Sequence, residues 1–306
     1  MGTARRAPTV RNGEDALGAT PLLLIIKGVR LMTSKARLGR IQYLNVLPIY
    51  FALEHVFNDN GFHLVRGTPA ELNSRMRRGE IDLGSISAME YGRNAADYLL
   101  LPDLSISSRG PVGSVLLFSR MPFPELYGRS IRVSAASASG AALLKVLMAK
   151  LFGVTPSYRR GPLAGCSLDG VTAVLAIGDE ALRLKKDQTL PFELDLGAAW
   201  QELTGLPFVF GVWAVRRAFA KARPEDTAAL HRLLLRSRTW GLGSLAELSR
   251  LAAAPFGMTP AQVLTYFQQL DYSLGPEHER GLRTFFQYLV AQGELPEAPR
   301  LEYFQG

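Results

Sequence analysis

The sequence has few of the residues that metal centres, disulfide-rich domains and nucleophilic enzymes require. Its 306 residues include one cysteine, Cys166, so no disulfide can form within the chain. Neither a CxxC pair nor a Cys/His cluster is present, which argues against structural zinc and against an oxidising compartment. The 4 histidines are scattered, and no HExxH helix, GxSxG turn or paired-acid arrangement occurs. We therefore expect neither a metal nor a cofactor.

Long apolar runs are missing as well. The run Leu22–Ile26 ends at Lys27, whereas a secretory segment needs roughly 7 to 15 apolar residues and a membrane helix roughly 20. We therefore expect a cytoplasmic protein without a membrane partner. Residues 1–36 include a stretch without a sustained period ahead of a second methionine, Met32, and we expect this part to be an extension outside the fold. Residues 301–306 end in YFQG, which resembles the remnant of a protease-cleavable tag, and we assign them to neither lobe.

Positive charge is abundant, but it is not concentrated. The formal net charge is +8 and the sequence pI is about 9.7, while the arginines are spread along the chain rather than gathered in runs. No nucleic-acid-binding module or basic stripe with interleaved aromatic residues accompanies this charge, so we expect no nucleic-acid partner. An anionic small molecule would also be attracted by a positive protein.

From residue 37 onward, short β-rich runs alternate with amphipathic helices. This alternation is typical of an α/β fold with mostly parallel strands. A hydroxyl residue followed by Glu or Gln three positions later marks several helix starts. These pairs are Thr68 with Glu71, Ser87 with Glu90, and Thr259 with Gln262.

Two extended stretches, 99–120 and 204–217, interrupt this alternation and predict two crossings between lobes. We expect one lobe to contain residues 37–112 with 216–300, and the other to contain residues 113–215. Ligands bind such folds where helix N-termini point free N–H groups into the cleft. The polar turns between strand and helix are therefore the candidate site.

The first such turn holds Asn45, in the stretch RIQYLNVLPIYFALE. The pattern predicts a strand over 39–43 and a helix over 46–56. The asparagine oxygen could cap this helix by accepting a hydrogen bond from the Leu47 amide, since Pro48 has none to give. It could also contact a ligand, and the two roles are compatible.

Similar alternatives hold for four other side chains. Ser137 and Ser139, in SAASASG, either cap a helix or help its free amides to bind a carboxylate or phosphate. No GxxxxGK[ST] pattern is present there, which argues against a nucleoside triphosphate. Ser114, in GPVGS, is either a strand-end residue or a ligand contact. Asp179, in IGDEAL, is a cap, a substrate contact or a base.

Five blocks of the sequence, taken in order, resemble the chorismate dehydratase family of the futalosine route to menaquinone. The blocks are GRIQYLNVLPIY, GTPAELNSRMRRGEIDLGSISAMEY, LLPDLSISSRGPVGSVLLFS, GDEAL and DLGAAWQELTGLPFVFGVW. The resemblance runs from about Gly39 to Trp213. It implies a two-lobed type II periplasmic-binding-protein fold that acts as a lyase and removes water from chorismate.

The same resemblance implies the site residues. Asn45 and Ser114 match the residues expected to be catalytic. The positions expected to bind substrate are Ser87, Gly110, Ser137, Ser139, Gly140 and Asp179. Gly140 departs from many relatives, which carry a hydroxyl residue there, so one substrate hydrogen bond is in doubt.

Because the matched blocks contain no histidine, we hypothesise that the enolpyruvyl carboxylate of chorismate takes the C3 proton, with Asp179 as the alternative base. Two other functions stay open: the dihydroxynaphthoate synthase of the same pathway, against which the YLN turn argues, and a solute-binding protein for a small carboxylate. The sequence leaves the oligomeric state open between monomer and homodimer.

Overall fold

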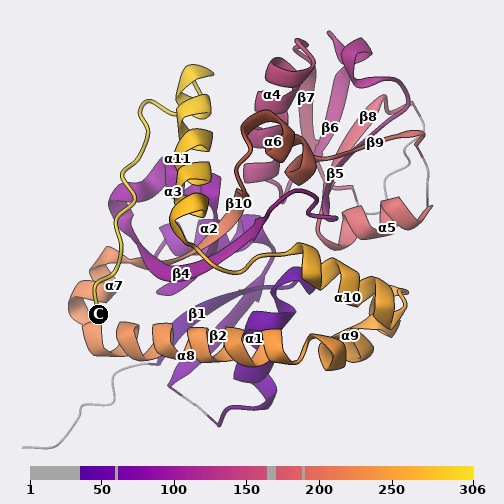
Figure 1. Cartoon of the computed structure of the whole chain (residues 1–306). Helices are drawn as coiled ribbons and strands as arrows, with labels where there is room; N and C mark the ends of the chain where they lie inside the picture. Colours follow the sequence, from indigo (N-terminus) through magenta and orange to yellow (C-terminus); the bar gives the residue numbers. More distant parts are fainter. Residues whose placement is uncertain (1–34, 59–60, 164–169, 188–189) are drawn as a thin grey trace, which may run out of the picture. The chain divides into compact units, whose positions relative to one another are not determined.

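The computed structural model describes residues 35–58, 61–163, 170–187 and 190–306 (Figure 1). The expectations for residues 1–34 and for Cys166 lie outside this part of the chain. The first strand already begins at Ala36, the last residue of the predicted extension.

The strands form two five-stranded sheets. The first has the order β2-β1-β3-β10-β4 and the second β7-β6-β8-β5-β9. The strands of the first sheet are β1 (Ala36–Ile41), β2 (Phe62–Gly67), β3 (Leu83–Ser87), β4 (Tyr98–Ser108) and β10 (Phe208–Arg216). Those of the second are β5 (Val115–Ser119), β6 (Ser130–Ser134), β7 (Ser157–Gly161), β8 (Ala173–Ile177) and β9 (Phe192–Asp195). The predicted α/β class is confirmed.

The expectation of mostly parallel strands is confirmed in strand direction, because four of the five strands in each sheet run the same way and one strand, β10 or β5, runs opposite to them. Strands β1 and β6 pair in parallel with both neighbours, whereas β10 and β5 pair antiparallel with both of theirs. The reason is that β5 and β10 are the first strands after each crossing. Each of them starts beside the C-terminal end of its neighbour, β8 or β3, and runs back along it, as the pairs Val115↔Ile177 and Gly211↔Ser87 show.

Helices fill the connections between strands and form most of the C-terminal part. They are α1 (Leu47–His55), α2 (Pro69–Arg77), α3 (Ala88–Asn94), α4 (Ser139–Leu151), α5 (Asp179–Asp187), α6 (Leu196–Thr204), α7 (Arg217–Ala222), α8 (Pro224–Gly243), α9 (Leu245–Ala253), α10 (Pro260–Gln269) and α11 (Pro276–Ala291). Short 3-10 turns are η1 (Leu44–Val46), η2 (Ala95–Asp97), η3 (Phe123–Leu126) and η4 (Ala254–Phe256). The capping boxes at Thr68 and Thr259 are confirmed, and Ser87 accepts from the Glu90 amide at 3.1 Å.

The chain crosses between the sheets at 109–114 and at 205–207. The sheets depart from the predicted lobe boundary at one end, because β10 starts at Phe208 and pairs with β3 and β4 of the first sheet. The apolar run over 208–215 therefore comes after the second crossing and belongs to the first sheet. The remaining boundaries of the two lobes stay a prediction.

The last residues of the chain pack against the first sheet. The Phe304 amide donates to the Leu100 carbonyl at 2.8 Å, and the Leu100 amide donates to the Glu302 carbonyl at 2.8 Å. Phe304 is 6% exposed. Because β4 is an edge strand, it has backbone groups free to pair with an added segment. These residues therefore pair with the first sheet rather than standing apart from both lobes, and their identity as a tag remnant stays a prediction.

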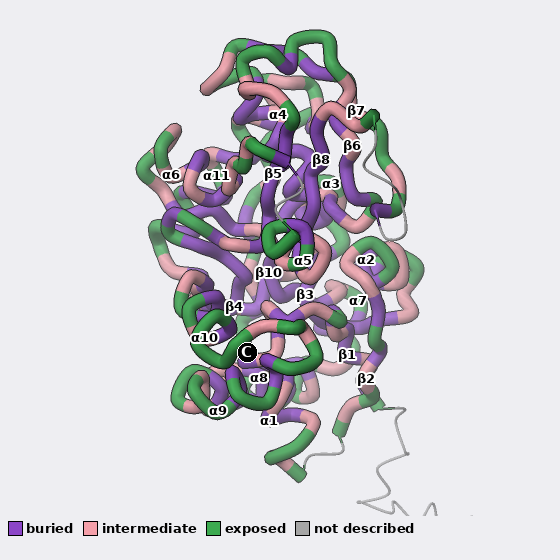
Figure 2. Tube along the Cα trace, turned by 90° about the vertical axis from the view of Figure 1, so that its right-hand side faces the viewer, coloured by how far each residue is buried: buried purple, intermediate pink, exposed green. Residues whose placement is uncertain are grey.

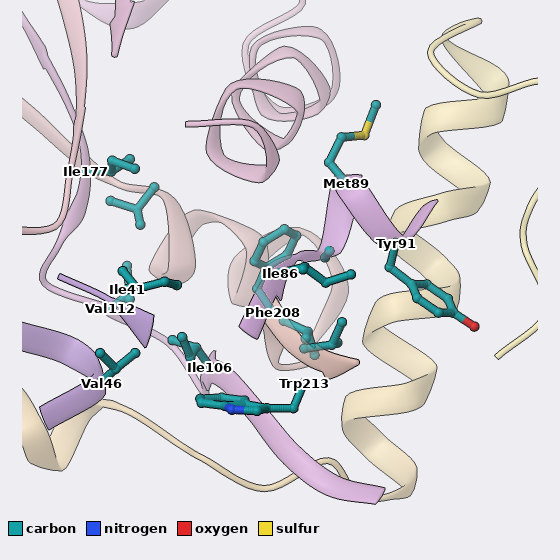
Figure 3. Close-up of a cluster of buried hydrophobic side chains, with 14 of the residues drawn as sticks. Ile41, Val46, Ile86, Met89, Tyr91, Ile106, Val112, Ile177, Phe208 and Trp213 are labelled. Carbon is teal, nitrogen blue, oxygen red and sulfur yellow. The ribbon is translucent and has the colours of Figure 1, made fainter. Parts of the chain in front are cut away.

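The core runs through both sheets, and Figure 2 shows the strands mostly buried while the outer sides of α9 and α10 are exposed. An apolar stripe on the last helix, formed by Leu282, Phe285, Phe286 and Leu289, is buried. Where the sheets approach each other, Ile41, Val112 and Ile177 lie near one another (Figure 3). These three residues also form part of the wall of a cavity.

Candidate active site

A cavity lies where the ends of strands from both sheets meet. It contains about 610 Å³ of space between its walls, including solvent at its open mouth. Its wall consists of Ile41, Tyr43, Asn45, Pro69, Ser85, Ile86, Ser87, Ile106, Val112, Ser114, Val115, Ala136, Ser137, Ala138, Ser139, Gly140, Ile177, Gly178, Phe210 and Gly211. Among the described residues, no acidic or basic side chain belongs to this wall. The polar groups in it are one amide, the hydroxyls of several serines and the phenol of one tyrosine.

Asn45 reaches this wall from the turn η1. Its side chain does not cap α1: the N-cap residue is Val46, without a side-chain bond, and the Leu47 amide donates to the Leu44 carbonyl. The capping alternative is wrong because the 3-10 turn displaces the helix start by one residue and uses the amide that the asparagine would need. Asn45 Oδ1 is buried and has no hydrogen-bond partner among the described residues.

Two serines of the wall share this property. Ser137 Oγ, from the loop before α4, and Ser85 Oγ, from β3, are buried and have no hydrogen-bond partner among the described residues. Ser139 Oγ accepts from the Met89 amide at 3.0 Å, at the start of α3. The N-cap of α4 is Ala138, without a side-chain bond, so neither predicted serine caps this helix.

Gly140 has no room for a side chain. A Cβ atom there would come within 2.4 Å of Ser137 Oγ and 3.1 Å of a methyl group of Val115. A hydroxyl residue at this position would force Ser137 to turn away. The identity of residue 140 is therefore coupled to the orientation of Ser137.

Ser114 lies directly before β5 and is 2% exposed. Its Oγ accepts from the phenol of Tyr266, on α10, at 2.9 Å. Its carbonyl accepts from the Gly178 amide at 2.7 Å. The residue is therefore both the end of a strand and part of the cavity wall.

Two other predicted site residues have different surroundings. Ser87 lines the cavity, but its Oγ already accepts from the Glu90 amide and from Asn73 Nδ2, each at 3.1 Å. Gly110 does not line the cavity, and its carbonyl accepts from Ser108 Oγ at 2.9 Å. The structure thus leaves Ser87 committed to a helix cap and Gly110 outside the wall.

Asp179 also lies outside the cavity wall. Its Oδ1 accepts from the Leu44 amide at 3.2 Å, and so joins the start of α5 to the turn that holds Asn45. Burial raises the pKa of Asp179 to about 6, outweighing the hydrogen bond from Leu44, which lowers it. Together with the Ser139–Met89 bond, this contact links the two sheets across the cavity.

Asp195, which binds the first crossing next to the cavity, was not predicted from the sequence. The Asp195 carboxylate accepts from the amides of Val112 and Gly113 in the first crossing, at 2.7 to 3.0 Å, and from those of Gly197 and Ala198 at 2.9 and 3.1 Å. The sequence carried a signal for part of this role, because an aspartate between a strand and a helix is a typical N-cap.

Within the described part of the chain, no histidine, cysteine, aspartate or glutamate lines this wall. None of the four histidines lies among the residues that line the cavity. Within the described ranges, no group of three or more histidine, cysteine, aspartate or glutamate residues could hold a metal ion. In the same part of the chain, no helix is long and apolar enough to cross a membrane.

The fold defines the protein as a member of the class with two-lobed periplasmic-binding-protein architecture. A solved protein of Archaeoglobus fulgidus superposes with a TM-score of 0.68 at 20% identity, covering 85% of this chain and 98% of that one. The alkanesulfonate-binding protein SsuA of Xanthomonas axonopodis pv. citri, bound to MOPS, gives 0.65 at 17% identity, covering 89% and 96%. At such identities the likeness concerns the fold alone.

Within this class, the chain belongs to the menaquinone biosynthesis family, which matches residues 36–291. It is 32% identical over 277 residues to the chorismate dehydratase of Thermus thermophilus, covering 86% of this chain and 96% of that protein. It is 27% identical over 271 residues to the 1,4-dihydroxy-6-naphtoate synthase of the same organism, covering 86% and 97%. The family suggested by the five sequence blocks is thus confirmed.

Proposed function

We propose that the protein is a cytoplasmic chorismate dehydratase that converts chorismate into 3-[(1-carboxyvinyl)oxy]benzoate and water. The observation that carries this proposal is that Asn45 and Ser114, expected from the resemblance to be catalytic, belong to one cavity wall without charged side chains. The likeness to the Thermus thermophilus dehydratase, which extends over most of both chains, supports the same assignment.

The reaction suits a site built from neutral groups. Loss of the C3 proton of chorismate delocalises negative charge through the ring double bond onto the ring carboxylate. The C4 hydroxyl group then leaves with the electron pair of its C–O bond, the ring becomes aromatic, and the proton and hydroxide together form the water released. Fixed hydrogen-bond donors in a cavity with little water can stabilise the charge that develops without changing their own protonation.

The proton acceptor is the enolpyruvyl carboxylate of the substrate itself. This assignment is supported by the wall, which includes no carboxylate and no histidine. It is also supported by Asp179, which lies outside the wall and accepts the Leu44 amide. The protein would bind the substrate, orient its carboxylate toward C3 and keep bulk water away. The positive net charge would attract the dianionic substrate.

The direct test is to incubate the purified protein with chorismate and follow the ultraviolet absorbance of the aromatic product. We expect Asn45→Ala and Ser114→Ala to lower kcat by about 10²- to 10³-fold, the usual effect of removing one donor from an active site. Ser249→Ala is the matched control, because its buried hydroxyl donates to a carbonyl within α9. If chorismate is recovered unchanged from the wild-type protein, the proposal is wrong.

Asp179→Asn tests the alternative base. If the substrate carboxylate takes the proton, this variant keeps most of its activity. A loss above about 10³-fold in Asp179→Asn, without a comparable loss in Asn45→Ala, would instead identify an aspartate base. Binding of chorismate without turnover would favour a solute-binding protein. Activity on the substrate of the naphthoate synthase would favour the sister enzyme.

A further inference from the structure

Two buried tyrosines from the C-terminal part of the chain contact the two residues proposed as catalytic. The Tyr266 phenol, on α10, donates to Ser114 Oγ at 2.9 Å. The Tyr272 phenol, three residues after α10, donates to the Asn45 carbonyl at 2.7 Å. The tyrosines are 3% and 2% exposed, so water competes little for their protons. They lie close together in the chain, although their partners are far apart in it.

The bond from Tyr266 determines what Ser114 can do. A hydroxyl oxygen that accepts from a phenol keeps its own proton, which must be donated elsewhere. Since Ser114 lines the cavity, its hydroxyl group is left to donate toward a bound substrate. Burial raises the pKa of Tyr266, so the phenol keeps the proton that it donates to Ser114 throughout the range in which enzymes work. The bond thus turns a freely rotating serine into a directed donor.

The tyrosine is held firmly against the first crossing. Gly113, directly before Ser114, lies so close to α10 that a Cβ atom there would come within 2.5 Å of Gln269 Oε1. It would also lie 3.5 Å from the ring of Tyr266. The serine, its preceding glycine and the helix therefore form one packed contact.

Tyr272 is attached just as firmly to the first sheet. The Ser105 amide donates to the Tyr272 carbonyl at 3.1 Å, and Ser107 and Asp271 exchange two backbone hydrogen bonds at 2.8 and 2.9 Å. The phenol is thereby presented at a fixed place to the turn η1. Asn45 needs such support, because its own side chain does not hold the turn.

We propose that Tyr266 and Tyr272 are positioning residues of the active site. Tyr266 directs the Ser114 hydroxyl toward the substrate, and Tyr272 fixes the turn that presents the Asn45 amide. The C-terminal helices therefore serve the cavity, although they contribute nothing to its wall. This inference rests on the proposed dehydratase function.

The test combines single and double substitutions in the full chain. We expect Tyr266→Phe to lower kcat by about tenfold while KM changes less than about threefold, because the ring stays and only the directing bond is lost. In a Ser114→Ala background the same substitution should have no further effect, whereas in an Asn45→Ala background its effect should persist. For Tyr272→Phe we expect the reverse: no further effect in an Asn45→Ala background, and the full effect in a Ser114→Ala background.

Tyr91→Phe is the matched control, because this buried phenol donates to the Arg300 carbonyl at 2.8 Å, away from the cavity. Thermal unfolding of all variants separates loss of folding from loss of positioning. If Tyr266→Phe turns over as fast as Tyr91→Phe, or slows Ser114→Ala further by the full factor, the positioning role is refuted while the dehydratase function stands.

Crystal structures of Tyr266→Phe and the wild type provide a readout that needs no turnover. We expect Ser114 to adopt a different or mixed side-chain rotamer in the variant. An unchanged Ser114 would contradict the inference even if the wild type proved inactive on chorismate, which would refute the proposed function separately. If Tyr272→Phe fails to fold, the Tyr266 variants alone decide the part that concerns Ser114.

Discussion

Helices α2 and α4 both begin after hydroxyl residues, and the protein uses these hydroxyl groups in different ways. At α2, Thr68 and Glu71 form a closed capping box, with the Thr68 amide donating to the Glu71 carboxylate at 2.8 Å. At α4, Ser137 Oγ has no partner among the described residues, and Ser139 accepts from the other side of the cavity. A hydroxyl group that its own helix already uses is not available to a ligand. Ser137 Oγ is available to a ligand, and Ser137 lines the cavity.

A third helix start, Asp195 at α6, extends the comparison, because it caps its helix and also holds the first crossing. Asp195→Ala should have the largest effect on stability, since four backbone amides lose a carboxylate acceptor. We expect the free energy of unfolding to fall by about 3 kcal/mol in urea denaturation, as for the loss of a cap plus charged hydrogen bonds.

Asp195→Asn is the matched variant, and it should lose less because one acceptor oxygen remains. Equal stability of Asp195→Ala and wild type would mean that water replaces the carboxylate at no cost. A loss of activity in Asp195→Asn beyond its loss of stability would show that the crossing also sets the position of Ser114.

The turns could be found from the sequence, but the use of their side chains could not. Asn45 stood out because a polar residue breaks a strand–helix pattern, and that pattern is local. Capping and ligand binding call for the same residue types at the same place, so Ser137 and Thr68 gave the same signal. The contacts of Tyr266 and Tyr272 join residues distant in the chain, which leave no periodic trace. The reversed direction of β5 and β10 was missed for a similar reason, because an apolar run such as 208–215 does not encode its direction.

Alanine at the two hydroxyl positions tests the comparison directly. Thr68→Ala should cost about 1 kcal/mol of stability and leave kcat/KM unchanged, because the Thr68 hydroxyl is used by its own helix and Thr68, unlike the adjacent Pro69, does not line the cavity. Ser137→Ala should leave stability unchanged or slightly higher, because it removes a buried hydroxyl that has no partner among the described residues, and should lower kcat/KM by about tenfold. The measurements are denaturation in urea and turnover of chorismate. The reverse pattern would mean that Ser137 is structural.

Gly140→Ala perturbs the same serine without removing it. The added methyl group would meet Ser137 Oγ at 2.4 Å, so the serine must rotate, and the 3.1 Å contact with Val115 must widen. We expect KM for chorismate to rise by several-fold, and the unfolding free energy to change by less than about 1 kcal/mol, because alanine also favours the helix. In a Ser137→Ala background the effect on KM should disappear. If it persists, the methyl group acts on the substrate or on Val115 instead.

The smallest expected effect concerns Asp179, a fourth helix start, whose carboxylate reaches across to the Leu44 amide. Burial raises its pKa to about 6 from an ordinary value of 3.8, so the folded protein binds this proton more tightly than the unfolded chain does. The stability linked to the proton is therefore fully present below about pH 4 and is lost as the pH rises through 6.

Asp179→Asn removes this dependence. Relative to wild type, the variant should gain stability between pH 4 and pH 7 in thermal unfolding, with Asp187→Asn, at the exposed end of α5, as the control for the lost charge. A difference between wild type and variant that stays constant over this range would mean that the carboxyl group is not desolvated, and that the contact with Leu44 serves as an ordinary cap-like bond between the lobes.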